Sequence, residues 1–184
     1  MKKLISLLLA LACLLSLSPV MAEEEAAPAP AVNTPITLEA YQQAYETLIA
    51  AVVPDCTVTW SSAQLEDGSE AWMGIINDAF AAVMLLPVDG MVSEIAVLLQ
   101  SDLTEDTLFT FLSMAGYAGA ALLVDEETTP EAACSAFVDE LYIVFSAMVS
   151  NEQPENIYGL PGAMSISAAA DGSYQYYFIL KLAE

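Results

Sequence analysis

Apolar residues recur three or four positions apart in residues 38–53, which predicts a helix with one apolar side. Thr37 precedes this segment and can accept a hydrogen bond from the first turn, where the carboxylate of Glu39 complements the helix dipole. Pro54 follows the segment and marks its end. The predicted buried stripe consists of Tyr41, Tyr45, Leu48 and Val52.

The next part of the chain, residues 56–100, has the shorter apolar period that is typical of β-strands. Turn residues divide it into four segments, so we predict an antiparallel meander. Asp89-Gly90 predicts a tight hairpin, because both central positions of such a turn need a positive φ. The predicted strands are residues 56–64, 71–77, 79–88 and 91–100.

Residues 107–124 are expected to form a second helix that carries no charge. Asp102 and Glu105 have the spacing of a capping pattern before this apolar run. Its flanks are acidic and it contains small and hydroxyl residues, so we expect a buried helix rather than a membrane span. Self-association of two copies through residues 107–124 is the alternative use of such a surface.

A third helix and a final hairpin complete the pattern. Thr129-Pro130 predicts the start of the helix, with threonine as N-cap and proline in the first helical position. Asp139 and Glu140 are expected to face away from the core, and Asp171-Gly172 marks the hairpin turn. The buried residues are predicted to be Phe137, Leu141, Phe145 and Met148 in the helix and Tyr174, Tyr176, Phe178 and Leu180 in the last strand.

The elements therefore follow in the order α-β-β-β-β-α-α-β-β. A run of strands followed by a run of helices is typical of α+β domains. We predict a single α+β domain over residues 36–184, with an antiparallel sheet of about six strands and the helices packed on one face. The general character is that of small exported bacterial domains.

The first residues read as a secretory signal peptide. Residues 1–22 contain two lysines, an apolar run and small residues before Glu23, where we expect cleavage. The alternative is a lipoprotein acylated at Cys13, which the leucines directly after this cysteine disfavour. Residues 23–35 are rich in glutamate, alanine and proline and are expected to form a flexible spacer. We therefore expect a secreted or envelope protein.

The chain is strongly acidic, with a formal net charge of −22. Loss of Lys2 and Lys3 with the signal peptide would leave Lys181 as the remaining basic side chain. Nucleic acids and anionic membranes bind lysine and arginine, so both are excluded as expected partners. Cations, basic peptides and basic protein surfaces are favoured instead, although the charge could also serve only to keep the protein in solution.

Two cysteines lie beyond the signal peptide. Cys56 shares a strand face with Val58 and Trp60, and Cys134 lies on the side of its helix that carries Phe137. Both are expected to point into the core. An exported protein can keep a disulfide, so a Cys56–Cys134 bridge is one hypothesis, and two separate buried thiols are the other.

The residue types that are missing exclude most catalytic mechanisms. The chain has no histidine and no arginine, so it lacks imidazole-based nucleophile activation, imidazole metal ligands and bidentate anion clamps. Lys181, near the end of a strand pattern, is expected to be a solvated or edge-blocking charge. We predict no catalytic, cofactor-binding or metal-binding residues.

Carboxylates are the remaining side chains that could support catalysis or bind a metal ion. A glycosidase needs two suitably spaced acids and a cleft, and its tryptophans, here Trp60 and Trp72, could stack on a sugar. Calcium would need oxygen ligands, but no acidic cluster has the spacing of a calcium-binding loop. The clusters considered are Glu66-Asp67, Asp102-Glu105-Asp106 and Asp125-Glu126-Glu127.

The sequence thus favours a non-enzymatic, exported domain with a binding or interaction role at the cell envelope or outside the cell. Its expected partner is a protein, in particular a basic one, and the contact is expected on the open sheet face or on the apolar second helix. The alternatives are a small carboxylate-based hydrolase and a binder of cations or cationic peptides.

Overall fold

The structure is a computed structural model, which describes residues 31–53, 55–77, 80–125, 127–149 and 156–182 of the 184-residue chain. It is an α+β domain, as the sequence predicted, with three helices and an antiparallel sheet of seven strands rather than about six. The helices are α2 (Leu38–Val52), α3 (Glu105–Ala120) and α4 (Pro130–Val149). The strands are β1 (Val58–Gln64), β2 (Glu70–Ile76), β3 (Phe80–Val88), β4 (Met91–Ser101), β5 (Asn156–Ile157), β6 (Leu160–Ala168) and β7 (Tyr174–Lys181).

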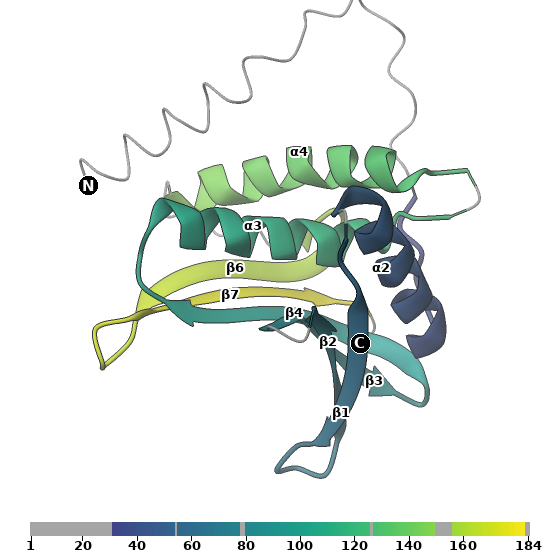
Figure 1. Ribbon diagram of the computed structural model, residues 1–184, viewed down its shortest axis with the longest axis horizontal. Coiled ribbons are helices and arrows are strands. Elements are labelled where there is room, and N and C mark those ends of the chain that lie inside the picture. Colours follow the sequence, from purple (N-terminus) through teal and green to yellow (C-terminus); the bar gives the residue numbers. More distant parts are fainter. Residues whose placement is uncertain (1–30, 54, 78–79, 126, 150–155, 183–184) are drawn as a thin grey trace, which may run out of the picture.

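The strand order in the sheet is β1-β2-β3-β4-β7-β6-β5. The first four strands form the predicted meander, and the chain then crosses one face of the sheet as α3 and α4. The last strand, β7, pairs with β4 on one side and with β6 on the other. The additional seventh strand is the short β5, which pairs with the start of β6. All three helices lie on the same side of the sheet (Figure 1).

The sheet is bent along its length. β1 and β2 turn downward from the level of β4, β7 and β6 (Figure 1). The strand register shifts between Gly74 and Ile75 in β2 and between Leu86 and Pro87 in β3. Such bulges increase the local twist and bend the strands that contain them. The bend sets β1 and β2 at an angle to β4, β7 and β6 while leaving one continuous sheet.

The main core lies between the helices and the covered face of the sheet. Val97, Phe178 and Met164 are register neighbours in β4, β7 and β6, and all three are buried. Phe111 and Ala115 of α3 belong to the same buried cluster. The apolar character of the second helix thus reflects burial within one molecule.

The close approach of α3 and α4 explains the small residues of α3. A Cβ atom on Gly119 would lie 1.8 Å from the Cζ atom of Phe137, so only glycine fits opposite this ring. Phe137, Leu141 and Phe145 form the predicted buried stripe of α4. The side chain of Met148, the fourth predicted member, lies outside the described residues. None of the helices described is long and apolar enough to cross a membrane.

Two of the predicted helix starts are confirmed and one is wrong. The Oγ1 atom of Thr37 accepts a hydrogen bond from the backbone N–H of Ala40, and Thr129 does the same for Ala132. Asp102 is not the N-cap of α3. The cap is Thr104, whose extended backbone lets its hydroxyl accept a hydrogen bond at 3.1 Å from the N–H of Thr107. The short threonine side chain reaches this N–H directly, so the helix begins two residues later than the acidic pattern suggested.

Glu140 does not simply face solvent, as the sequence suggested. Its Oε1 atom accepts a hydrogen bond from the backbone N–H of Tyr158, at 2.7 Å. Tyr158 has a positive φ in the turn between β5 and β6, and its ring stacks on Phe137. This carboxylate therefore ties α4 to the start of the C-terminal hairpin. Asp139 beside it is exposed, as expected.

The turns follow the local sequence. Asp89 and Gly90 have φ values of 52° and 79°, which confirms the predicted tight hairpin between β3 and β4. The signal peptide predicted for residues 1–22, the lipoprotein alternative at Cys13 and most of the predicted spacer lie outside the described residues. The end of that spacer is docked on the domain, because the backbone N–H of Asn33 donates to the carbonyl of Leu122 at 2.8 Å.

Candidate functional site

The candidate functional site is the face of the sheet that the helices leave uncovered, named here the helix-free face. Strand alternation places every second residue on it, and the strand register aligns these residues into rows that cross the sheet. One row runs through six strands and is almost entirely apolar. In order across the sheet it comprises Ser61, Met73, Met84, Ala96, Ile179 and Ala163.

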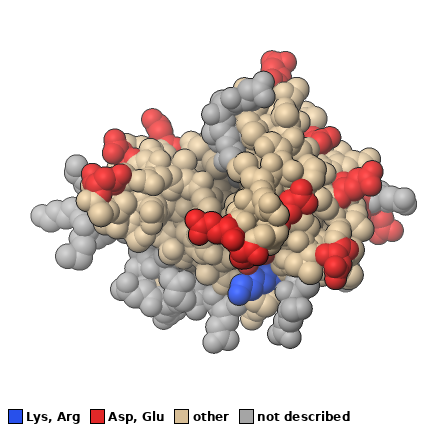
Figure 2. Space-filling model, turned by 90° about the horizontal axis from the view of Figure 1, so that it is seen from below, with Lys and Arg blue, Asp and Glu red and all other residues tan. Residues whose placement is uncertain are grey.

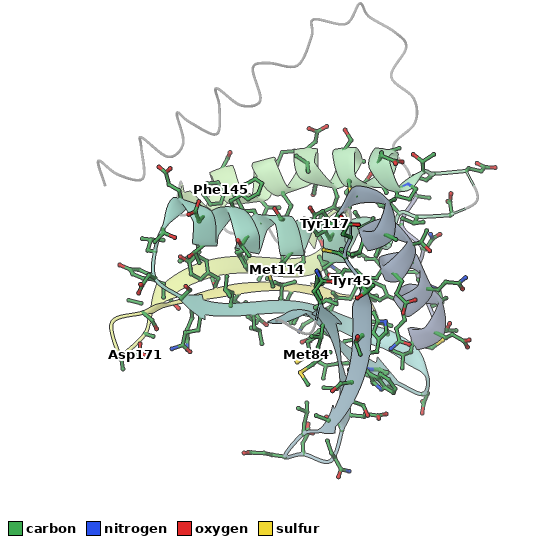
Figure 3. The ribbon with its side chains drawn as sticks, viewed as in Figure 1. Tyr45, Met84, Met114, Tyr117, Phe145 and Asp171 are labelled. Atoms are coloured by element: carbon green, nitrogen blue, oxygen red, sulfur yellow. The ribbon has the colours of Figure 1, made fainter. Side chains whose placement is uncertain are left out.

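Figure 3 shows the position of this row. Met84 projects below the sheet, whereas Met114 and Phe145 lie above it among the helices. Ala96 and Ile179 are only 1% and 7% exposed although they are not part of the main core cluster. In the register of the sheet the short Ala96 lies between the larger Met84 and Ile179. The row is therefore a packed apolar surface with the more exposed side chains around it.

The neighbouring rows extend this surface. Leu98, Tyr177 and Ser165 form the row on one side, and Leu98 is 51% exposed. Such exposure of a large aliphatic side chain next to other apolar groups is typical of a contact surface rather than of a core. Methionine is flexible and polarisable, so a surface built around Met73 and Met84 can adapt to partners of different shape.

A single pair of opposite charges lies beside the apolar row. Glu94 of β4 is the register partner of Lys181 of β7. Lys181 is exposed, but it is not an edge-blocking charge, because β7 lies between β4 and β6 inside the sheet. Burial raises the pKa of the nearby Tyr177 hydroxyl, and the charge of Glu94 raises this pKa further.

Figure 2 views the molecule from below the sheet. Acidic side chains are scattered around broad uncharged areas, and one blue patch marks a basic side chain, which is Lys181 because it is the one lysine within the described ranges. The helix-free face thus combines an uncharged, partly apolar surface with acidic surroundings. Such a charge distribution favours the approach of cations over that of anions.

The two cysteines are free thiols, so the structure shows the second of the two hypotheses, separate thiols, and not a Cys56–Cys134 disulfide. Both pack against the main core, as expected. Burial raises the pKa of the Tyr117 hydroxyl, and the negative charge that Cys134 and Cys56 carry as thiolates raises it further. The sulfur of Cys56 instead accepts a hydrogen bond from Nδ2 of Asn77 at 3.2 Å.

The carboxylates with shifted pKa values are turn residues. Asp67 accepts hydrogen bonds from the backbone N–H and the hydroxyl of Ser69, at 2.9 and 2.6 Å. Asp171 accepts the equivalent pair from Ser173, at 3.0 and 2.6 Å. These bonds stabilise the charged form and lower the pKa of both aspartates. The same Asp-Gly-Ser sequence thus closes the first and the last hairpin of the sheet.

Further candidate acids have equally local surroundings, and Glu126 lies outside the described residues. Asp125 accepts hydrogen bonds from the backbone N–H groups of Glu127 and Thr128, which lower its pKa. Glu105 begins α3 and Asp102 offers its backbone carbonyl to the hydroxyl of Tyr176. Within the described ranges, no three acidic or thiol side chains gather closely enough to hold a metal ion.

Neither tryptophan lies on the helix-free face. Trp60 packs edge-on against Tyr45 of α2, and its indole N–H donates to the Oε1 atom of Glu46 at 2.8 Å. Trp72 pairs in register with the buried Leu85, so it also points to the helix-covered side. Both rings are partly buried and pack against the core, so they do not form the sugar-stacking surface that was considered for a glycosidase.

The residues of the helix-free face were missed in the sequence analysis, which anticipated an open face without naming its members. In β4, apolar residues occur on both sides of the strand, so Ile95 and Val97 cannot be told from Ala96 and Leu98 by alternation. The cross-strand row also depends on a register with two bulges. Neither is visible as a local sequence signal.

Comparison with known protein families, with curated proteins and with solved structures finds no match to this chain. A function is therefore inferred from the surface of the molecule itself.

Proposed function

We propose that this protein is an exported, non-enzymatic binding domain of the cell envelope or the extracellular space, and that the helix-free face is its contact surface for a protein partner. The observation that carries this proposal is the apolar row across six strands, from Ser61 to Ala163, on the face that the helices leave uncovered. Export follows from the signal-like residues 1–22.

The partner is expected to combine apolar and basic groups. Its apolar groups would cover Met84, Leu98 and their neighbours, while its basic groups would lie opposite the surrounding carboxylates. The net charge of −22 favours such a partner and disfavours nucleic acids and anionic lipids. Electrostatic attraction would mainly speed association, and the apolar contact would supply most of the affinity.

The second helix offers less contact surface than the sequence suggested. Most of its apolar side chains, among them Leu108, Phe111 and Met114, are buried within the molecule. Phe109 is its exposed large side chain, at 68%. Self-association through residues 107–124 would therefore depend on a small patch, whereas the helix-free face presents several strands.

The proposal is tested by site-specific photo-cross-linking in the producing cells. A photoreactive amino acid is placed at Leu98 on the helix-free face or, as a matched control, at Val138 on α4, which is 45% exposed. We expect an adduct with a protein of the medium or envelope from position 98 and none from position 138. The captured protein, once purified, should bind the unmodified domain and bind the Leu98→Glu variant at least about tenfold more weakly.

Two results would contradict the proposal. Adducts that form equally from both positions would mean non-specific contact, and adducts from position 138 alone would place the binding surface on the helices. Export is examined in the same cells by N-terminal sequencing of the released protein, which should begin at Glu23.

A further inference from the structure

β1 is an edge strand with an unpaired backbone. It pairs with β2 only and ends the strand order of the sheet. At its two ends, the N–H of Asn77 donates to the carbonyl of Thr57 and the N–H of Leu65 donates to the carbonyl of Ser69. The register between these bonds is regular, so Thr59, Ser61 and Ala63 also exchange backbone hydrogen bonds with β2.

The alternate residues of β1 point their backbone groups outward. These residues are Val58, Trp60, Ser62 and Gln64, the non-hydrogen-bonded positions of the pair with β2. Within the described part of the chain, no backbone or side-chain group pairs with their N–H and C=O groups. A free row of this kind is a template for a further strand.

β1 also lacks the features that usually protect an edge strand. Proteins place lysine, proline, charged side chains or bulges on such strands to prevent pairing with other chains. The sequence of β1, VTWSSAQ, contains no charge and no proline. Its register with β2 is unbroken over seven residue pairs, whereas the bulges of the sheet lie further inside.

Carboxylates surround both ends of this edge. Asp55 precedes the strand, and the carboxylate of Glu46 is held beside it by the indole N–H of Trp60. Glu66, Asp67 and Glu70 lie at the hairpin that follows the strand, and all three are exposed. β1 itself thus carries no charge, and carboxylates lie before it, beside its first half and at the hairpin that follows it.

We infer that β1 accepts an extended segment of a partner protein as an additional strand, and that this segment has an uncharged centre with lysine or arginine at both ends. The backbone of the segment would pair with the outward groups of Val58 to Gln64, which is the strand-addition mode of peptide recognition. Its basic ends would lie near the two groups of carboxylates. The inference rests on the proposed binding role, but it concerns the edge rather than the face.

A second copy of this chain fits the edge less well. Pairing two β1 strands would bring the carboxylates of one copy close to those of the other, and the net charge of −22 per chain opposes such an approach. Electrostatic complementarity therefore distinguishes a basic segment from self-pairing, although both could satisfy the backbone.

The test uses a synthetic peptide of alternating threonine and valine with two lysines at each end. Binding is followed by tryptophan fluorescence, to which Trp60 in β1 and Trp72 both contribute, and by amide hydrogen exchange. We expect protection of Val58, Trp60, Ser62 and Gln64, and about tenfold weaker binding of the same peptide with glutamate in place of lysine. In Ser62→Pro, which removes an outward N–H, binding should weaken by about fivefold or more, whereas Ser62→Ala should bind like the wild type.

Further measurements keep the test decisive. If Ser62→Pro fails to fold, the wild-type protein is tested with a peptide whose alternate amides are N-methylated, which should bind no better than the glutamate peptide. If the methylated peptide bound as tightly as the unmethylated lysine peptide, the inference would be wrong. It would also be wrong if light scattering showed a wild-type dimer that the Ser62→Pro substitution dissociates. If Leu98→Glu abolished peptide binding and Ser62→Pro did not, the peptide would bind the helix-free face. The inference about β1 would then be wrong, and the proposed function would stand.

Discussion

The two faces of the sheet are built from the same strands but have different surroundings. On the covered face, Val97 and Phe178 are buried beneath α3 and α4. On the helix-free face, the adjacent positions Leu98 and Tyr177 lie opposite each other, and Leu98 is half exposed. One residue step along a strand thus changes the environment from core to surface. The comparison shows that apolar character alone does not identify the core of this protein.

The largest expected difference between the faces is in stability. Phe178→Ala, which leaves a cavity beneath the helices, should lower the free energy of unfolding by about 3–5 kcal/mol. Leu98→Ala, on the neighbouring strand, should cost less than about 1 kcal/mol because half of its side chain is already exposed. Urea denaturation followed by circular dichroism measures both. Equal losses would mean that the helix-free face is also covered in solution.

A second prediction concerns the packing that closes the covered face. Gly119→Ala should lower the free energy of unfolding by about 1–3 kcal/mol, because the new methyl group would overlap the ring of Phe137. Gly116→Ala is the matched control in the same helix, since its Cβ would lie 3.3 Å from the flexible Cδ1 of Leu141. Alanine favours the helix by about 1 kcal/mol, so the control should be neutral or stabilising in thermal denaturation. The opposite order of the two variants would show that α3 and α4 pack differently.

A third prediction compares two buried tyrosines of α2. The hydroxyl of Tyr41 donates to the carbonyl of Ala118 at 2.7 Å, whereas the buried hydroxyl of Tyr45 has no partner among the described residues. Tyr41→Phe should therefore cost about 1–2 kcal/mol in chemical denaturation, and Tyr45→Phe should be neutral or slightly stabilising. A clear loss on Tyr45→Phe would instead reveal a partner for this hydroxyl, such as an ordered water.

The smallest expected effect is the pH dependence of the two Asp-Gly-Ser hairpins, which lie at the ends of the strands rather than on either face. The pKa values of Asp67 and Asp171 are lowered below the ordinary value of 3.8 by hydrogen bonds to the charged form. The stabilisation is therefore fully present above pH 3.8 and is lost as the pH falls through the lowered pKa.

An NMR titration of the aspartate carboxyl carbons checks this prediction. Ser173→Ala should raise the pKa of Asp171 toward 3.8 and leave that of Asp67 unchanged, because only Asp171 loses its hydroxyl donor while Asp67 keeps that of Ser69. A parallel change at both sites, or none at Asp171, would mean that the serine hydroxyls do not control these carboxylates.

Local interactions explain why so much of the fold was predictable. The caps at Thr37 and Thr129 and the hairpin at Asp89-Gly90 each depend on contacts within a few residues, which the sequence displays directly. The N-cap of α3 was assigned to the wrong residue because Asp102 and Thr104 both have side chains that can cap a helix. Glu140 was misassigned because its partner, the N–H of Tyr158, lies 18 residues further along the chain.

The amino-acid sequence by itself determined the order of the helices and of all strands except the short β5, the acidic charge and the absence of histidine and arginine, because these follow from composition and from short-range periodicity. The tertiary structure alone decided that β7 lies between β4 and β6, that Cys56 turns to Asn77, and that one apolar row remains outside the helices. Non-local strand pairing fixes these features. The register of the strands depends on how all the helices pack on the sheet. No single segment of the sequence specifies that packing.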